Sequence, residues 1–174
     1  QIDVASMQSF GEEFSHFLIA VDVFSRFTRA EPLKSTRQED VVAVFREWKP
    51  HPKICDSDNG PEFFGKFAEY CREQNITQQM KLPNDLNSLS VVDKRIQQVK
   101  NLVSGGLMRQ KEFDGDKQRD KQTWDQLLPQ IIAGLNHSPT EALLDSAPAD
   151  VKGNNQLQFQ LLKDNADKFV QNQE

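Results

Sequence analysis

Cysteine and histidine are scarce in this 174-residue chain, which has two cysteines and three histidines. Cys55 and Cys71 are too few for a disulfide framework, and the histidines are too scattered for a structural zinc site. Apolar runs of the roughly 20 residues that a membrane span needs are missing, and no signal peptide opens the sequence. We therefore expect a protein of a reducing, intracellular compartment with no membrane partner. Because the chain starts at Gln1 rather than at a Met, we also expect flanking domains to be missing from it.

Positive charge is also in short supply, since 21 Lys and Arg face 26 Asp and Glu, for a net charge of −5. The acidity lies in residues 112–174, with 6 basic and 11 acidic residues, whereas residues 1–111 hold 15 of each. Within 94–111 there are five basic residues and no acidic one, namely Lys94, Arg95, Lys100, Arg109 and Lys111. This stretch could neutralise nucleic-acid phosphates, and a solvated helix face is the alternative that charge alone leaves open.

Strand and helix patterns are mixed along the chain. The predicted strands span 1–7, 14–24, 28–34, 53–58 and 76–82, the first three as an antiparallel meander. The predicted helices span 37–49, 61–74, a stretch from 90 onward, 124–135 and 154–171. This order predicts an α/β fold with one five-stranded mixed sheet flanked by helices.

Several local signals refine these boundaries. A capping-box pattern over 36–39 is expected to open the first helix, and Pro61 suits the first position of the second. Gly105-Gly106 is expected to interrupt or end the helix from residue 90, and residues 111–121 read as a charged linker. Pro129 is a predicted kink.

Three aspartates stand where the predicted elements begin or end. Asp3 lies between apolar residues of the first strand, Asp58 ends the fourth strand, and Asp93 falls in the first turn of a helix. Carboxylates that converge from three elements can hold Mg²⁺ or Mn²⁺, and two such ions support phosphoryl transfer. Asp22 and Asp56 sit in equally apolar strands, and Asp58 before Asn-Gly could simply form a turn, so the pattern alone does not choose the ligands.

The spacing of these aspartates is informative, because Asp58 follows Asp3 by 55 positions and Asp93 follows Asp58 by 35. The flanking segments are Gln1-Ile2-Asp3-Val4, Val21-Asp22-Val23-Phe24-Ser25-Arg26-Phe27, Asp58-Asn59-Gly60-Pro61-Glu62-Phe63 and Val91-Val92-Asp93. Together they resemble the catalytic core of retroviral and retrotransposon integrases and related transposon integrases. Further segments, Trp124-Asp125-Gln126-Leu127-Leu128, Asn136-His137-Ser138-Pro139 and Ala147-Pro148, look like later helices of that family. The resemblance predicts a core domain over 1–151 and a C-terminal helical extension over 152–174.

The resemblance implies a ribonuclease-H-like fold in which Asp3, Asp58 and Asp93 are the catalytic metal ligands for two Mg²⁺ or Mn²⁺ ions. It implies that Lys100 contacts DNA, and we expect its neighbours Lys94 and Arg95 to bind DNA with it. Other matching positions have lesser expected roles. Asp22 would be structural, Glu62 would lie outside the metal triad, and Asn59, Asn87 and Ser88 would frame the active-site loop. For Asn87 and Ser88 the alternative is a solvated polar loop.

The activity that the resemblance implies is metal-dependent processing of DNA 3′ ends and strand transfer, by a polynucleotidyl transferase that acts in DNA integration. It also implies DNA as partner, self-association into a homo-oligomer and a nuclear location. The alternative is an inactive integrase-derived domain that serves as an interaction or structural module of a larger assembly. Asp93 in place of the family's usual Glu, Ser90 in place of a glycine, and the net acidity favour that alternative. A ribonuclease-H-like nuclease without joining activity is a third possibility.

Overall fold

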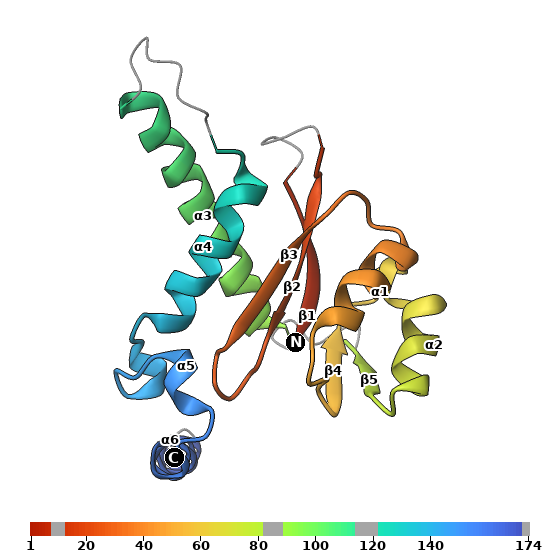
Figure 1. Ribbon diagram of the computed structural model, residues 1–174. Coiled ribbons are helices and arrows are strands. Elements are labelled where there is room, and N and C mark those ends of the chain that lie inside the picture. Colours follow the sequence, from red (N-terminus) through yellow and green to blue (C-terminus); the bar gives the residue numbers. More distant parts are fainter. Residues whose placement is uncertain (8–12, 82–88, 114–121, 172–174) are drawn as a thin grey trace.

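The computed structural model describes residues 1–7, 13–81, 89–113 and 122–171. Its first sheet is antiparallel, with strands in the order β1 (Ile2–Ser6), β2 (His16–Val21) and β3 (Thr28–Leu33). The predicted meander is therefore confirmed (Figure 1). Within it, Asp3 lies opposite Ile19 of the central strand.

A second, parallel sheet pairs β4 (Ile54–Ser57) with β5 (Thr77–Met80). Strand β4 contacts β1, but the described strands form separate sheets of three and two rather than one sheet of five. The expectation of a single five-stranded mixed sheet is corrected accordingly. Side-chain alternation identifies each strand, but it does not fix whether neighbouring backbones come close enough to form a hydrogen-bonded ladder.

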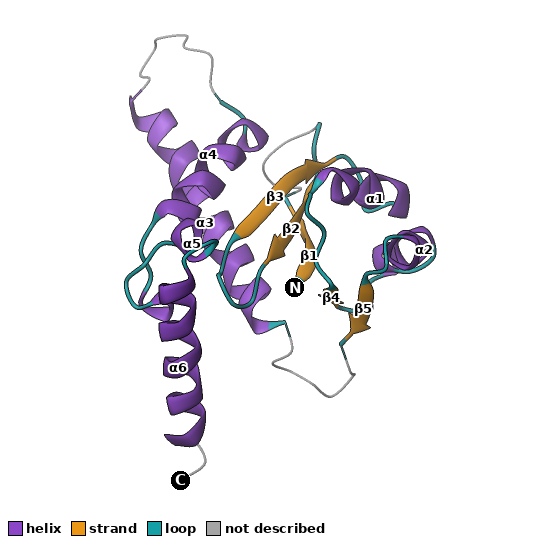
Figure 2. Ribbon diagram, turned by 60° about the horizontal axis from the view of Figure 1, so that its bottom comes forward, coloured by secondary structure: helices purple, strands orange, loops and turns teal. Residues whose placement is uncertain are grey.

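Helices cover both faces of the antiparallel sheet (Figures 1 and 2). Helices α1 (Gln38–Glu47) and α2 (Lys66–Glu73) pack on one side. Helices α3 (Ser90–Phe113) and α4 (Trp124–His137) pack on the other. The central strand β2 is apolar along most of its length because both of its faces are buried.

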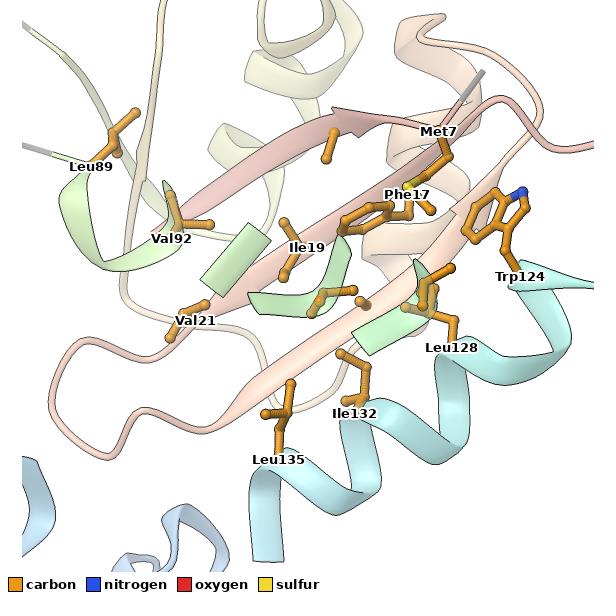
Figure 3. Packing of buried hydrophobic residues seen from close by; sticks show 14 residues of the cluster. Met7, Phe17, Ile19, Val21, Leu89, Val92, Trp124, Leu128, Ile132 and Leu135 are labelled. Carbon is orange, nitrogen blue, oxygen red and sulfur yellow. The ribbon is translucent and has the colours of Figure 1, made fainter. Parts of the chain in front are cut away.

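Alternate residues of β2 enter two different cores. Phe17, Ile19 and Val21 join the cluster beneath α3 and α4, where Phe17 packs against Trp124 with ring centroids 6.2 Å apart (Figure 3). Leu18 joins the cluster formed with α1 and α2. These two cores hold the sheet between its helical layers and so fix the positions of the residues at the ends of its strands.

The C-terminal part is helical. It comprises the short η2 (Glu141–Leu143), α5 (Pro148–Val151) and the long α6 (Asn155–Gln171), which begins one residue later than predicted. Helix α6 buries Leu157 and Leu161 in a small third cluster to which Phe24 of the β2–β3 turn contributes. No helix among the described residues has the length and apolar character that crossing a membrane requires.

Two helix boundaries differ from the sequence-based expectation because of glycines. The predicted helix 61–74 divides into the short η1 (Pro61–Phe63) and α2, because Gly65 between them has a φ of +48°. The helix from Ser90 instead continues through Gly105-Gly106 to residue 113, so these glycines do not end it. A Cβ on Gly106 would lie 3.3 Å from Leu127 of α4, so its absence eases the close approach of the two helices.

The predicted capping box at the start of α1 does not form, since the cap residue Arg37 makes no side-chain capping hydrogen bond. Ser35 serves this end instead, because its Oγ accepts from the Arg37 N–H at 3.2 Å and donates to Asp40 at 2.6 Å. A capping box does form at α4, where the Thr123 N–H donates to Gln126 Oε1 at 3.1 Å. Pro129 lies inside α4, which continues to His137.

Candidate active site

Asp3 is the second residue of β1 and lies on the side of the sheet that α3 covers. Because strand residues alternate between faces, Asp3 shares its face with Ala5 and Met7, which pack in the cluster beneath α3 and α4. Its side chain is half-buried, and Oδ1 accepts a hydrogen bond of 2.7 Å from the Val4 N–H. The strand therefore holds a carboxylate at the edge of an apolar core.

Asp58 follows β4 directly and is held by a tight turn. Its Oδ1 accepts a hydrogen bond of 2.9 Å from the Gly60 N–H. Asn59 anchors the same turn by donating from Nδ2 to the Lys81 carbonyl oxygen at 3.0 Å, just beyond the end of β5. The turn thus fixes the Asp58 carboxylate at the end of the parallel sheet.

Gly60 allows a second carboxylate to reach this turn. A Cβ on Gly60 would lie 2.8 Å from Glu62 Oε2 and 2.9 Å from Asp58 Oδ1, so both carboxylates lie against the bare Cα of this glycine. Glu62 reaches that position because η1 begins immediately after the turn, with Pro61 at its first position. Sequence reasoning left Glu62 outside the metal triad, and only the local fold brings it beside Asp58.

Asp93 is exposed in the first turn of α3. The start of this helix is tied to the start of β1, because the Gln1 side-chain oxygen accepts a hydrogen bond of 3.3 Å from the Val92 N–H. Val92 itself is fully buried in the cluster beneath α3 and α4. These contacts place the first turn of α3 beside the strand that carries Asp3.

The electrostatic surroundings of Asp3 include the three other carboxylates. Burial raises the pKa of Asp3 from an ordinary 3.8 to about 7, and the hydrogen bond from Val4 opposes this rise. The charges of Asp58, Asp93 and Glu62 raise the pKa further. Four elements therefore bring negative charge to one region, where a cation would be favourable.

The chemistry of these donors fits a hard divalent cation, because carboxylate oxygens are the ligands that Mg²⁺ and Mn²⁺ prefer. These carboxylates are more widely spaced than the ligands of a metal-bound site. Among the described residues, no three or more His, Cys, Asp or Glu side chains are grouped closely enough to hold a metal ion. The structure thus gathers the predicted ligands in one region without closing them into a coordination shell.

The predicted DNA-binding residues separate onto different sides of α3. Lys100 follows Asp93 by seven residues, so both lie on the same side of the helix. Lys94 is exposed. Arg95 lies two residues beyond Asp93 and hence on the opposite flank, where its guanidinium donates to the Arg26 carbonyl oxygen at 3.4 Å.

Two further expectations concern loops. Asp22 shapes the β2–β3 turn, because its Oδ1 accepts from both the N–H and the hydroxyl of Ser25, at 2.6 and 2.7 Å. Asn87 and Ser88, expected to frame the active-site loop, lie outside the described residues.

A groove of about 530 Å³ lies between β3, the end of α1 and α4, with Arg29, Trp48 and Ile132 in its lining. It contains none of the predicted site residues. The candidate site is therefore the carboxylate group and not this groove.

The fold and the carboxylate group together define an α/β domain with acidic residues gathered where β1, β4 and α3 meet. Comparison with known families is more specific, since residues 1–85 match the model of the family described as integrase core domain. This match confirms the resemblance for that part of the chain and implies a ribonuclease-H-like fold. Asp3 and Asp58 fall inside the matched region, and Asp93 falls beyond it.

A relative supports the same family. The chain is 28% identical over 98 residues to the Intracisternal A-particle Pol-related polyprotein of mouse intracisternal A-particle MIA14. The aligned region covers 54% of this chain but only 11% of the polyprotein. Both findings support an integrase-like domain of the retroelement type, and the likeness of the later helices to that family stays a prediction.

Proposed function

We propose that this chain is the catalytic core of an integrase, which processes DNA 3′ ends and transfers the strand into target DNA with the help of divalent metal ions. The observation that carries this proposal is the half-buried Asp3. Burial and the neighbouring Asp58, Asp93 and Glu62 carboxylates raise its pKa to about 7. It lies within the region that matches the integrase core domain. A carboxylate kept in such surroundings is typical of a functional site.

Asp3, Asp58 and Asp93 are the residues that would hold two Mg²⁺ or Mn²⁺ ions. Bound divalent ions would supply activation of an attacking oxygen and stabilisation of the leaving oxygen. The chain's own part is to orient these carboxylates on β1, the β4 turn and α3. Asp93 is one methylene shorter than Glu, about 1.5 Å, so the first turn of α3 must approach the strands to complete the set.

DNA is the proposed substrate, with water or a DNA 3′ hydroxyl as nucleophile and no covalent enzyme intermediate. Lys100 lies on the same side of α3 as Asp93, where it can contact the DNA end, and Lys94 is exposed nearby. We further propose a core domain over 1–151 with a helical extension, self-association, flanking domains that supply further DNA contacts, and a nuclear site of action.

A second candidate is an inactive integrase-derived module that acts through interactions in a larger assembly. The open arrangement of the carboxylates, with no closed group of three among the described residues, favours it. The shorter Asp93 side chain at the third position favours it as well.

Strand cleavage and rejoining on a branched DNA substrate tests the proposal, with Mg²⁺ or Mn²⁺ present. The native chain is compared with Asp58→Asn, and Asp145→Asn is the matched control because Asp145 is an exposed carboxylate with a φ of 58°, which Asn also adopts. Activity in the native chain and the control, with none in Asp58→Asn, is the expected result. If only an Asp93→Glu variant is active, or if all folded variants are silent, the interaction module replaces the enzyme.

A further inference from the structure

Helix α6 projects away from the sheet and its covering helices (Figure 2). Its first turns attach it, because Leu157 and Leu161 are buried in a small cluster with Leu143 and Val151. Over the described residues of α6, no other side chain is buried. The rest of the helix surface is therefore not covered by the chain's own core.

A stripe of apolar side chains runs along the uncovered side of α6. Residues three, four or seven apart share a face of a helix, and at about 100° per residue this face is nearly opposite Leu157 and Leu161. The stripe spans about three turns, and the side chains that form it are between 59% and 70% exposed: Phe159, Leu162, Phe169 and Val170. Ala166 lies among them on the same face and completes this α6 stripe. Single exposed apolar side chains are ordinary, but a continuous stripe of them marks a surface that a partner covers.

The charges of α6 cancel, since Lys163 and Lys168 are matched by Asp164 and Asp167. Lys168 and Asp164 pair with each other at 2.7 Å, on the side of the helix that carries the buried leucines. Lys163 and Asp167 lie one turn apart on one flank of the α6 stripe. Helices that lie on membranes carry a polar face rich in Lys and Arg, which α6 lacks. The charge pattern thus favours a protein partner that is itself neutral at the contact.

We propose that the α6 stripe binds the α6 stripe of a second copy of this chain, with the two helices antiparallel. The inference rests on the proposed function only in that it supplies a surface for self-association. Antiparallel helices pair residues whose numbers have a constant sum. With Phe159 opposite Phe169 of the second copy, Leu162 therefore falls opposite Ala166 of that copy. The apolar residues of one stripe then meet apolar residues of the other along its length.

The flanking charges fit the same alignment. A two-fold axis between the helices places each flank against the same flank of the second copy. Lys163 then lies about 3 Å along the helix axis from Asp167 of the second copy, within the span of a lysine side chain. The symmetry forms this ion pair twice. A neutral contact also avoids the repulsion that two chains of net charge −5 meet elsewhere.

The size of the stripe predicts a weak dimer. Covering its four exposed side chains on both copies removes about 900 Å² of surface, and the flanking residues add to this area. The total lies at the low end for specific interfaces. We therefore expect a dissociation constant of about 10 µM.

Sedimentation equilibrium of the full chain from about 1 to 100 µM measures this dimer. Phe159→Gln and Phe169→Gln each replace an exposed side chain, so the fold should keep its melting temperature. Each is expected to raise the dissociation constant by about tenfold or more. The matched control is Met108→Gln, which removes an exposed apolar side chain of α3 and should change the constant by less than about twofold.

A charge exchange tests the antiparallel alignment. Lys163→Glu alone and Asp167→Lys alone each place like charges together twice, so each variant should be monomeric where the native chain is dimeric. In an equal mixture of the two variants, both contacts between unlike chains join opposite charges. The mixture should therefore recover the native dimer, which a parallel alignment does not predict.

Sedimentation of the native chain as a monomer up to about 100 µM overturns the inference, and so does a dimer that Phe159→Gln and Phe169→Gln leave intact. Binding of a monomeric native chain to phosphatidylcholine vesicles, lost in Phe169→Gln, would assign the stripe to a lipid surface and overturn it as well. The proposed enzyme function fails separately. If α6 dimerises the chain but no divalent ion supports strand cleavage, the interface stands and the integrase reaction does not. If the native chain cleaves DNA and the stripe variants leave its oligomeric state unchanged, the reverse holds.

Discussion

Replacing Asp3 by Asn is expected to stabilise the fold above neutral pH while it removes a proposed metal ligand. The Asp3 pKa is about 7 in the folded chain, against an ordinary 3.8. Because the folded value is the higher one, the unfolded chain loses this proton first as the pH rises. The native fold is therefore favoured below pH 4 and is progressively destabilised between about pH 4 and pH 7.

The size of the effect follows from these two pKa values. A difference of about three units corresponds to about 4 kcal/mol at pH 8, with 1.36 kcal/mol per unit. At pH 5 the same relation gives about 2 kcal/mol, because the folded chain still holds the proton there. Asn carries no charge at any of these pH values, and its side-chain oxygen can still accept the hydrogen bond from the Val4 N–H.

Urea denaturation at pH 5 and pH 8 measures this difference. Asp3→Asn should exceed the native chain in unfolding free energy at both values, by about 2.5 kcal/mol more at pH 8 than at pH 5. Asp145→Asn is the control and should change stability by less than about 0.5 kcal/mol at either pH, since Asp145 is exposed. Addition of Mg²⁺ should stabilise the native chain and leave Asp3→Asn unaffected. A gain for Asp3→Asn that does not depend on pH would refute the reasoning.

Three other predictions test the fold and the site. Asn136→Ala should lower the unfolding free energy, measured by urea denaturation, by about 2–4 kcal/mol. The buried Asn136 side chain forms hydrogen bonds of 2.8 Å with both the N–H and the carbonyl oxygen of Thr28 in β3. A loss below about 1 kcal/mol would contradict this prediction. Gly60→Ala should reduce strand cleavage by about a hundredfold, because its Cβ would displace two carboxylates. Gly134→Ala, where a Cβ meets nothing within 4 Å, should leave cleavage unchanged, and equal rates for the two variants would count against the site. Burial raises the pKa of Cys55 to about 12 and that of Cys71 to about 11. Both thiols should therefore resist a thiol reagent at pH 8 until the chain is unfolded. Rapid labelling of the folded chain would contradict their burial.

Patterns of apolar residues were sufficient to locate most elements of this fold. The apolar run over 14–24 predicts a strand, and the structure has β2 there with Phe17 and Leu18 in different cores. The glycines were harder to interpret. Gly65 divides a predicted helix because its backbone has a positive φ. Gly106 stays inside a helix, where it allows a close contact with α4.

The candidate site was predictable only in part. Asp3 stands out in the sequence because a carboxylate among apolar strand residues is costly to bury unless it has a partner. Glu62 did not stand out, since its approach to Asp58 depends on the turn at Gly60 and the short helix that follows. The contact between Arg26 and Arg95 joins residues 69 positions apart, and no local pattern marks such a pair.

Metal rescue at position 58 tests the central claim most directly, namely that the Asp58 carboxylate binds the metal ion that supports DNA strand cleavage. Asp58→Cys should be inactive on branched DNA with Mg²⁺, which prefers oxygen ligands, and should regain activity when thiophilic Cd²⁺ is added. Asp58→Asn should stay inactive with either ion. Cleavage by Asp58→Cys in Mg²⁺ at the native rate, or no cleavage by the folded native chain with any divalent ion, would contradict the account.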